Sequence, residues 1–233
     1  MKITYLLSLA LFINMSCNTP ISTKDTTQKP TGFTLTGTVF DKDGESLYLH
    51  IFKNNQIQKI DSVKKIDSVK IHNQEFQFTG ALDYPHKASL LFKGHNNEFP
   101  FILSNENVQV NLDAYQIENS QIKNSKINDE LAKIKEASAH IYRKIDYLYP
   151  LLQKARIEND SKNLKKINLE IQTIMDENQT YLLNYIKENP DHYLSALLLN
   201  DLWFSRKNDT LVLKKLASQL NIKVKPALDF AIH

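Results

Sequence analysis

The hydrophobic pattern changes its period once along the chain, and this change constrains the fold more than any other feature. Between residues 33 and 113, bulky apolar residues alternate with small or polar ones, as in FTLTGTVF (33–40) and VQVNLD (108–113). From Lys126 onward, apolar residues recur in alternating steps of four and three. A period of two predicts half-buried strands, and a period near 3.5 predicts packed helices. The sequence therefore predicts an α+β protein in which strands come first and helices follow.

The region with a period of two contains a series of short strand-like segments. Residue pairs that favour turns separate them, among them Asn73-Gln74 and Tyr84-Pro85. The predicted strands are residues 33–40, 46–52, 65–72, 75–80, 86–94, 99–104 and 108–113. Short strands at this spacing are typical of an antiparallel β-sandwich, which we place at residues 32–114.

The hexapeptide KIDSVK occurs twice in direct succession, at residues 59–64 and 65–70. Six is an even number, so the second copy leaves every side chain of a strand on its original face. The duplication is therefore compatible with a longer hairpin or with two competing registers, and we assign it no function.

The region with helical period predicts an antiparallel helical hairpin within a helical domain at residues 120–222. Ser125 is the expected N-cap of its first arm, Asp160 or Ser161 caps the second, and Pro150 is expected to kink or interrupt the first. Further helices are expected at 192–204 and 210–220, before a tail at 223–233. We interpret the apolar stripe as the contact between the two arms, with a partner-binding seam as the alternative. Its positions are Ile127, Leu131, Ile134, Ser138, Ile141, Ile145, Leu148, Leu152 and Ala155, then Leu164, Ile167, Ile171, Ile174, Asn178, Tyr181 and Tyr185.

The N-terminus resembles the signal of a bacterial lipoprotein. Lys2 precedes an apolar run at residues 3–13, and Ser16 stands before Cys17, the single cysteine of the chain. The run is too short to span a bilayer as a permanent helix. The resemblance implies a signal peptide at residues 1–16, cleavage between Ser16 and Cys17, and fatty acyl chains on the Cys17 thiol. The alternatives are an ordinary secretory signal with an incidental cysteine, or, less favoured, a catalytic or metal-binding cysteine.

A tether and a location follow from the lipoprotein interpretation. Residues 17–31 are rich in Thr, Ser, Pro and Lys, as in flexible linkers. Acidic residues do not follow Cys17 as a run, so we expect a periplasm-facing anchor in the inner or outer membrane. The expected partners are membrane lipid, through acylated Cys17, and an envelope protein of unknown identity.

Three stretches of the strand region carry a second resemblance. They are IDSVKIHNQEFQFTG (66–80), YPHKASLLFKG (84–94) and FPFILSNENVQVNLD (99–113). They are similar to the N-terminal β-domain of the lipoproteins with domain of unknown function 4369. In that family an Asp-Ser pair precedes a strand, and an aromatic-x-aromatic strand ending in Gly follows. The matching positions here are Asp67, Ser68, Phe76, Phe78 and Gly80. The family pattern holds no catalytic residue to transfer.

The segment YIKENPDHYLSALLLNDL (185–202) extends this resemblance. In many relatives such a segment precedes a thioredoxin-like domain, of the peroxiredoxin and TlpA-like kind, that carries a CxxC motif. The present chain has no cysteine after Cys17. It resembles the accessory front half of that architecture, so the resemblance does not imply redox activity here.

Charge and motifs predict neither a cofactor nor a catalytic site. The net charge is +3 from 29 basic and 26 acidic residues mixed along the chain, which gives little attraction to nucleic acid. The sequence contains 5 glycines and no glycine-rich phosphate loop. His95 with Glu98 is the nearest approach to a metal site, and Asp129-Glu130 and Asp176-Glu177 are interpreted as solvated helix surface. We expect no metal.

These observations favour a non-enzymatic binding or interaction module, held to a membrane in the cell envelope. The alternative is an accessory or truncated N-terminal part of a periplasmic thiol-disulfide oxidoreductase system. A decayed gene is a third possibility, which the KIDSVK duplication supports.

Overall fold

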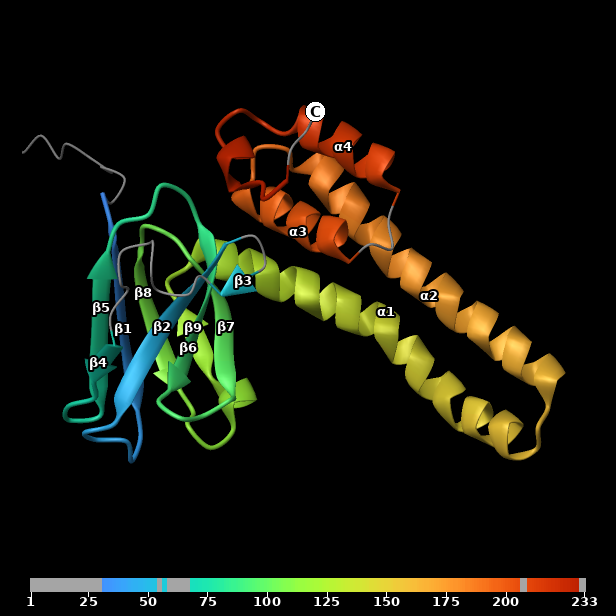
Figure 1. The fold of residues 1–233 in the computed structure, drawn as a ribbon, viewed down its shortest axis with the longest axis horizontal. Coiled ribbons are helices and arrows are strands. Elements are labelled where there is room, and N and C mark those ends of the chain that lie inside the picture. The colour runs from blue at the N-terminus through green and yellow to red at the C-terminus, as the bar shows by residue number, and fades with distance from the viewer. Residues whose placement is uncertain (1–30, 54–55, 58–67, 206–208, 231–233) are drawn as a thin grey trace, which may run out of the picture.

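A computed structural model describes residues 31–53, 56–57, 68–205 and 209–230 (Figure 1). Nine strands come first within these residues, and the helices follow. The α+β class and the order of its two parts are confirmed. The strands are β1 (Phe33–Val39), β2 (Ser46–Lys53), β3 (Gln56–Ile57), β4 (Ser68–Lys70), β5 (Glu75–Gly80), β6 (His86–Phe92), β7 (Glu98–Leu103), β8 (Asn107–Leu112) and β9 (Gln121–Lys123).

The strands form two sheets that enclose one core. The first has the order β5-β1-β8-β9, and the second has the order β3-β2-β6-β7. The short strands β3 and β4 both pair with β2, on the edge away from β6. Every pair is antiparallel except β1 with β8. The sandwich was predicted as antiparallel, and this parallel pair is the one departure from it among the described strands.

The core of the sandwich follows the alternation of the sequence. On β1, Leu35 and Val39 are buried, whereas Thr38, next to Val39, is exposed. On β5, Phe76 and Phe78 are buried. The predicted turn at Asn73-Gln74 is also present, with φ of 52° and 63° in the two residues. Positive φ at both central residues is the geometry of a two-residue hairpin loop, whose twist suits the flanking strands.

Helices α1 (Lys126–Ile157) and α2 (Ser161–Glu188) form the predicted hairpin (Figure 1). All sixteen predicted seam positions are buried or half-buried. The Asp160 side chain caps α2 by accepting from the backbone N–H of Lys162 and Asn163, at 3.1 and 3.0 Å. The Asn163 N–H is the main reason that the pKa of Asp160 is lowered.

Ser125 is the N-cap residue of α1 as predicted, and of the two effects expected of Pro150, a kink or an interruption, the interruption is absent. Proline in a helix interior removes one backbone hydrogen bond, and the packing of Leu148 and Leu152 in the hairpin core supports the helix on both sides of it. Ser125 occupies the N-cap position but makes no side-chain cap. Its hydroxyl instead donates to Glu106 Oε2 at 3.2 Å.

Helices α3 (Tyr193–Phe204) and α4 (Thr210–Gln219) pack around the base of the hairpin (Figure 1). They share a core with Ile134 of α1, Ile186 of α2 and Ile102 of β7. The chain then returns across α3, where Phe230 stacks on Trp203 with the ring centroids 4.1 Å apart. The base of the hairpin is therefore enclosed by several elements.

The first turn of α1 is fastened to the edge strand β7. The Asn128 amide nitrogen donates to the Ile102 carbonyl at 2.6 Å, and its oxygen accepts from the Ile102 N–H at 2.8 Å. All of these groups are buried. One side chain thus replaces a neighbouring strand at the sheet edge, which would otherwise leave unpaired backbone groups. We call this contact the Asn128 clasp.

The signal peptide, Cys17, the first KIDSVK copy and half of the second lie outside the described residues. Within the described part, no helix is both long and apolar enough to cross a membrane.

Candidate functional site

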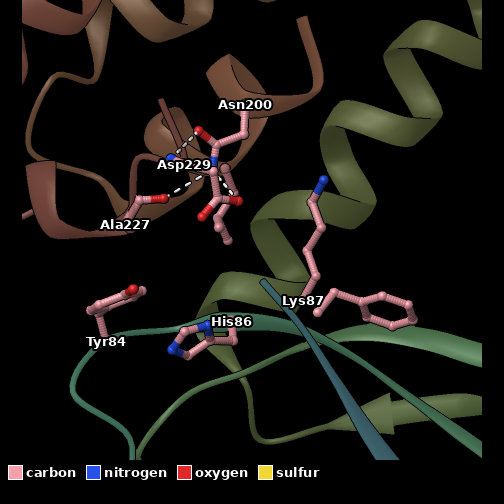
Figure 2. A pocket seen from close by; sticks show the side chains of 8 residues that line it. Tyr84, His86, Lys87, Asn200, Ala227 and Asp229 are labelled. Atoms are coloured by element: carbon pink, nitrogen blue, oxygen red, sulfur yellow. Dashed lines mark hydrogen bonds between the residues drawn. The ribbon is translucent and has the colours of Figure 1, made fainter. Parts of the chain in front are cut away.

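A small cleft lies between the sandwich and the helical part. Figure 2 shows Tyr84, His86 and Lys87 on its sheet side and Asn200 and Asp229 on its helical side. Its volume is about 10 Å³, room for roughly one water molecule. The cleft is thus too small for an organic ligand.

Polar contacts line the cleft, and one of them joins the two parts. The Asn200 amide donates to the carbonyl of Ala227 at 2.9 Å and accepts from the backbone N–H of Asp229 at 2.9 Å. Lys87 of β6 forms an ion pair with Asp201 of α3. Burial raises the pKa of Tyr84, and the negative charge of Asp229 raises it further. We interpret the cleft as a structural junction.

A cluster of ionisable side chains lies at the base of the hairpin. Glu130 Oε1 accepts from the Tyr185 hydroxyl at 2.5 Å and lies 2.6 Å from His192 Nδ1. Burial raises the pKa of Tyr185, and the hydrogen bond to Glu130 adds to this increase. The cluster ties α1, the end of α2 and the start of α3 together. Glu130 is therefore not the solvated surface residue that the sequence predicted.

The other candidate residues do not assemble into a metal site. Glu98 accepts from Ser89 Oγ at 2.7 Å, whereas His95 packs edge-on against Phe92. Glu177 pairs with Lys144 across the hairpin. Within residues 31–53, 56–57, 68–205 and 209–230, no three His, Cys, Asp or Glu side chains are grouped as metal ligands would be. Ser16 and Cys17, the predicted cleavage and lipidation residues, lie outside these ranges.

The outer part of the hairpin has the composition of a binding surface. Its turn lies at the end of the molecule farthest from the sandwich (Figure 1). We define residues 147–169 as the hairpin tip. Only three residues form its buried core: Leu152, Ala155 and Ile167. Of the twelve large apolar side chains that are exposed in the described chain, five belong to the tip: Tyr147, Tyr149, Leu151, Ile157 and Leu169.

The hairpin tip is also positively charged. It has five basic residues and two acidic ones, Glu158 and Asp160, for a net charge of +3. The basic residues are Lys154, Arg156, Lys162, Lys165 and Lys166. Apolar exposure and positive charge therefore coincide in one place.

Fold and surface define the class of the molecule as a β-sandwich with a firmly mounted helical arm. Residues 33–131 match the family model described as Domain of unknown function (DUF4369). The resemblance to that domain is thereby confirmed. The match runs from β1 through Asn128, so it includes the sandwich and the clasp, and it stops before the hairpin tip. No curated protein is similar enough to the chain to count as a match.

Proposed function

We propose that this protein is a lipoprotein of the cell envelope, anchored through acylated Cys17, and that it acts as a non-enzymatic interaction module. The observation that carries the proposal is the hairpin tip, where apolar and basic side chains are exposed at the end of a long arm. Helix α1 has 32 residues, about 48 Å at 1.5 Å per residue. Such an arm presents a binding surface well away from the sandwich.

The contacts that fix the base of the arm to the rest of the protein support this role. The Asn128 clasp fixes the first turn of α1 to β7, and the Glu130 cluster fixes the same helix to α2 and α3. A surface that loses little freedom on binding has a smaller entropic cost to overcome. The anchor is supported by the apolar run before Cys17 and the polar tether after it.

The intact mass of the native protein, extracted from membranes, tests the anchor. The expected mass is that of residues 17–233 plus acyl chains, and Cys17→Ser should abolish the acyl increment and membrane retention. A mass without acyl chains would contradict the anchor. A mass larger by that of a whole domain would show that the chain is part of a longer protein.

Crosslinking in cells tests the interaction role. A photoreactive residue in place of Tyr149 in the hairpin tip should capture a protein or lipid. The same residue in place of Phe40, an exposed aromatic of the sandwich, is the control. Equal capture from both positions, or none, would contradict an interaction through the tip.

A second candidate function is an accessory role in an envelope thiol-disulfide system. It is favoured by the similarity of residues 185–202 to the segment that precedes a thioredoxin-like domain in relatives of this domain family. Deletion of the gene should then shift exported proteins toward a different thiol state. An unchanged thiol profile would contradict this role.

A further inference from the structure

We propose that the hairpin tip binds the surface of an anionic phospholipid bilayer, approaching it end-on. The proposal names a partner for the interaction role above, but it does not depend on the Cys17 anchor. It rests on the arrangement of exposed side chains in the last turns of α1 and the first turns of α2.

The end of α1 presents an apolar face to solvent. Residues spaced by three, four, seven and ten positions share one face of a helix. Counted from Tyr147, these are Pro150, Leu151, Lys154 and Ile157, and all five are exposed. The exposed fraction is 81% for both Tyr147 and Ile157. A soluble hairpin normally places polar residues on such a face, and apolar ones on the face toward its partner helix.

The start of α2 presents a basic face. Lys162, Lys165 and Lys166 share one side of the helix with Leu169, by the same spacing, and all are exposed. The apolar face of α1 and the basic face of α2 end at the same turn, residues 158–160. An end-on approach therefore brings the near ends of both faces to one surface, with Tyr147 about 15 Å behind Ile157 along α1.

This combination fits a lipid surface better than a protein partner. Tyrosine is enriched at the membrane interface, where its ring is apolar and its hydroxyl stays hydrated. Lysine stems cover apolar surface while their ammonium groups reach phosphates. The centres of protein–protein interfaces are instead depleted in lysine, and four of the five basic residues of the tip are lysines. Leu151 and Ile157 supply the apolar side chains that would enter the headgroup region.

The charge of the tip predicts how its binding depends on the lipid composition of the membrane. Because the tip has a net charge of +3, an anionic surface attracts the turn at its end. Each lysine near such a surface contributes about 1 kcal/mol, or about fivefold in binding. The attraction decays over a Debye length of about 8 Å at 0.15 M ionic strength. Binding should therefore weaken as salt is added.

The test uses the chain from residue 17 with Cys17→Ser, so that no acyl chain can hold it to a membrane. Every residue of the three core clusters lies between Phe33 and Phe230, so the cores remain complete. Binding is measured by co-flotation with vesicles of phosphatidylcholine alone and with vesicles that contain phosphatidylglycerol. We expect binding to the anionic vesicles, and at least about tenfold weaker binding to the neutral ones, because two or more lysines contribute.

Matched variants locate the binding site. Ile157→Ser is compared with Ile222→Ser, whose isoleucine lies after α4 with a similar exposed fraction, 78% against 81%. The pair Lys165→Gln and Lys166→Gln is compared with Lys133→Gln and Lys135→Gln, which are exposed at the base of α1. We expect a loss of about threefold or more for Ile157→Ser and about 25-fold for the tip lysines. The control variants should bind as the parent does.

Two outcomes overturn the proposal. One is the absence of binding to anionic vesicles while circular dichroism shows a folded chain. The other is equal weakening by tip and control variants, which would place the contact elsewhere. The tip could also capture an envelope protein and fail to bind vesicles. That result would overturn the lipid partner but leave the interaction role standing. Loss of the acyl group on Cys17 would leave this result unchanged, so the two proposals fail separately.

Discussion

The base and the tip of the hairpin are built from the same two helices but differ in what surrounds them. At the base, Ile134 and Ile186 belong to a core that also contains residues of β7, α3 and α4. At the tip, the core consists of Leu152, Ala155 and Ile167, and only the two helices contribute to it. The base therefore has neighbours on several sides, whereas each helix of the tip has one.

This difference decides where exposed apolar side chains occur. At the base, α3 and α4 cover apolar residues that would otherwise face water. At the tip no such cover is present within the described chain, and Tyr147, Leu151 and Ile157 remain exposed. The apolar residues at the base contribute to stability, and the exposed ones at the tip are available for binding. The predictions below test this division.

The largest effect is expected when a buried isoleucine is truncated at the base. Ile186→Ala should lower the free energy of unfolding by about 4 kcal/mol, because the enclosing elements prevent the cavity from collapsing. Ile167→Ala, in the tip core, should cost about 2 kcal/mol, because two helices with solvent around them can close on the gap. Urea denaturation of both variants gives the comparison, and equal losses would contradict the division between base and tip.

The next largest effect concerns the Asn128 clasp. Asn128→Ala removes three hydrogen bonds, two with Ile102 and one with Ser125 Oγ, and leaves the buried N–H and C=O of Ile102 unpaired, at an expected cost of about 3 kcal/mol. Asn184→Ala is the control, because it makes the same change on an exposed helix surface and should stay within about 0.5 kcal/mol. Denaturation midpoints measure both. A similar result for the two variants would mean that the clasp is dispensable.

The clasp also shows what the sequence does not reveal. Strands and helices were predictable because burial repeats along each element with its own short period. The partner of Asn128 is 26 residues away, and nothing in the local pattern of α1 marks this asparagine. The strands β3 and β9 have two and three residues, which is too short to display a period. The parallel pairing of β1 with β8 depends on strands far apart in sequence.

The candidate surface was only partly predictable for a related reason. The aromatic residues of α1 were evident in the sequence, but whether Tyr147 packs or faces solvent depends on which elements surround it. The local charge of +3 at residues 147–169 could have been counted directly. The range to count over, however, is defined only by the place of the hairpin tip in the structure. The role of Glu130 was not predictable, because its partners Tyr185 and His192 come from other elements.

A smaller effect, of opposite sign, is expected in the seam of the hairpin. Asn178 is buried, its nitrogen donates to the Tyr142 hydroxyl at 3.0 Å, and its oxygen has no hydrogen-bond partner in the described structure. Asn178→Leu should raise the free energy of unfolding by about 1 kcal/mol, because it removes an unsatisfied polar atom and adds apolar burial.

Tyr142→Phe is the control for that change, since it removes the same hydrogen bond while leaving Asn178 in place. It should destabilise the protein slightly, and thermal denaturation distinguishes the two signs. A loss of stability with Asn178→Leu would instead show that this asparagine is required for the pairing of the arms, as a buried polar residue can be in a coiled coil.

An effect of similar size, and with a pH dependence, is expected at Tyr185. At neutral pH its hydroxyl donates to Glu130, and Tyr185→Phe should cost about 1 kcal/mol. The pKa of Tyr185 is raised in the folded protein above its ordinary value of 10.0, chiefly by burial. A raised pKa means that the folded state favours the protonated form, so this contribution is complete below about pH 10 and declines as the pH rises above it.

The variant lacks that ionisation, so the stability difference between the parent and Tyr185→Phe should shrink above about pH 10. Chemical denaturation at pH 8 and at pH 11 measures it. Tyr181→Phe, one turn earlier on α2 and also half-buried, controls for the loss of a hydroxyl. A difference that stays constant over this range would show that Tyr185 ionises equally easily in the folded and unfolded chains. The contact with Glu130 would then contribute nothing to the mounting of the arm, which would rest on the Asn128 clasp and the apolar core at its base.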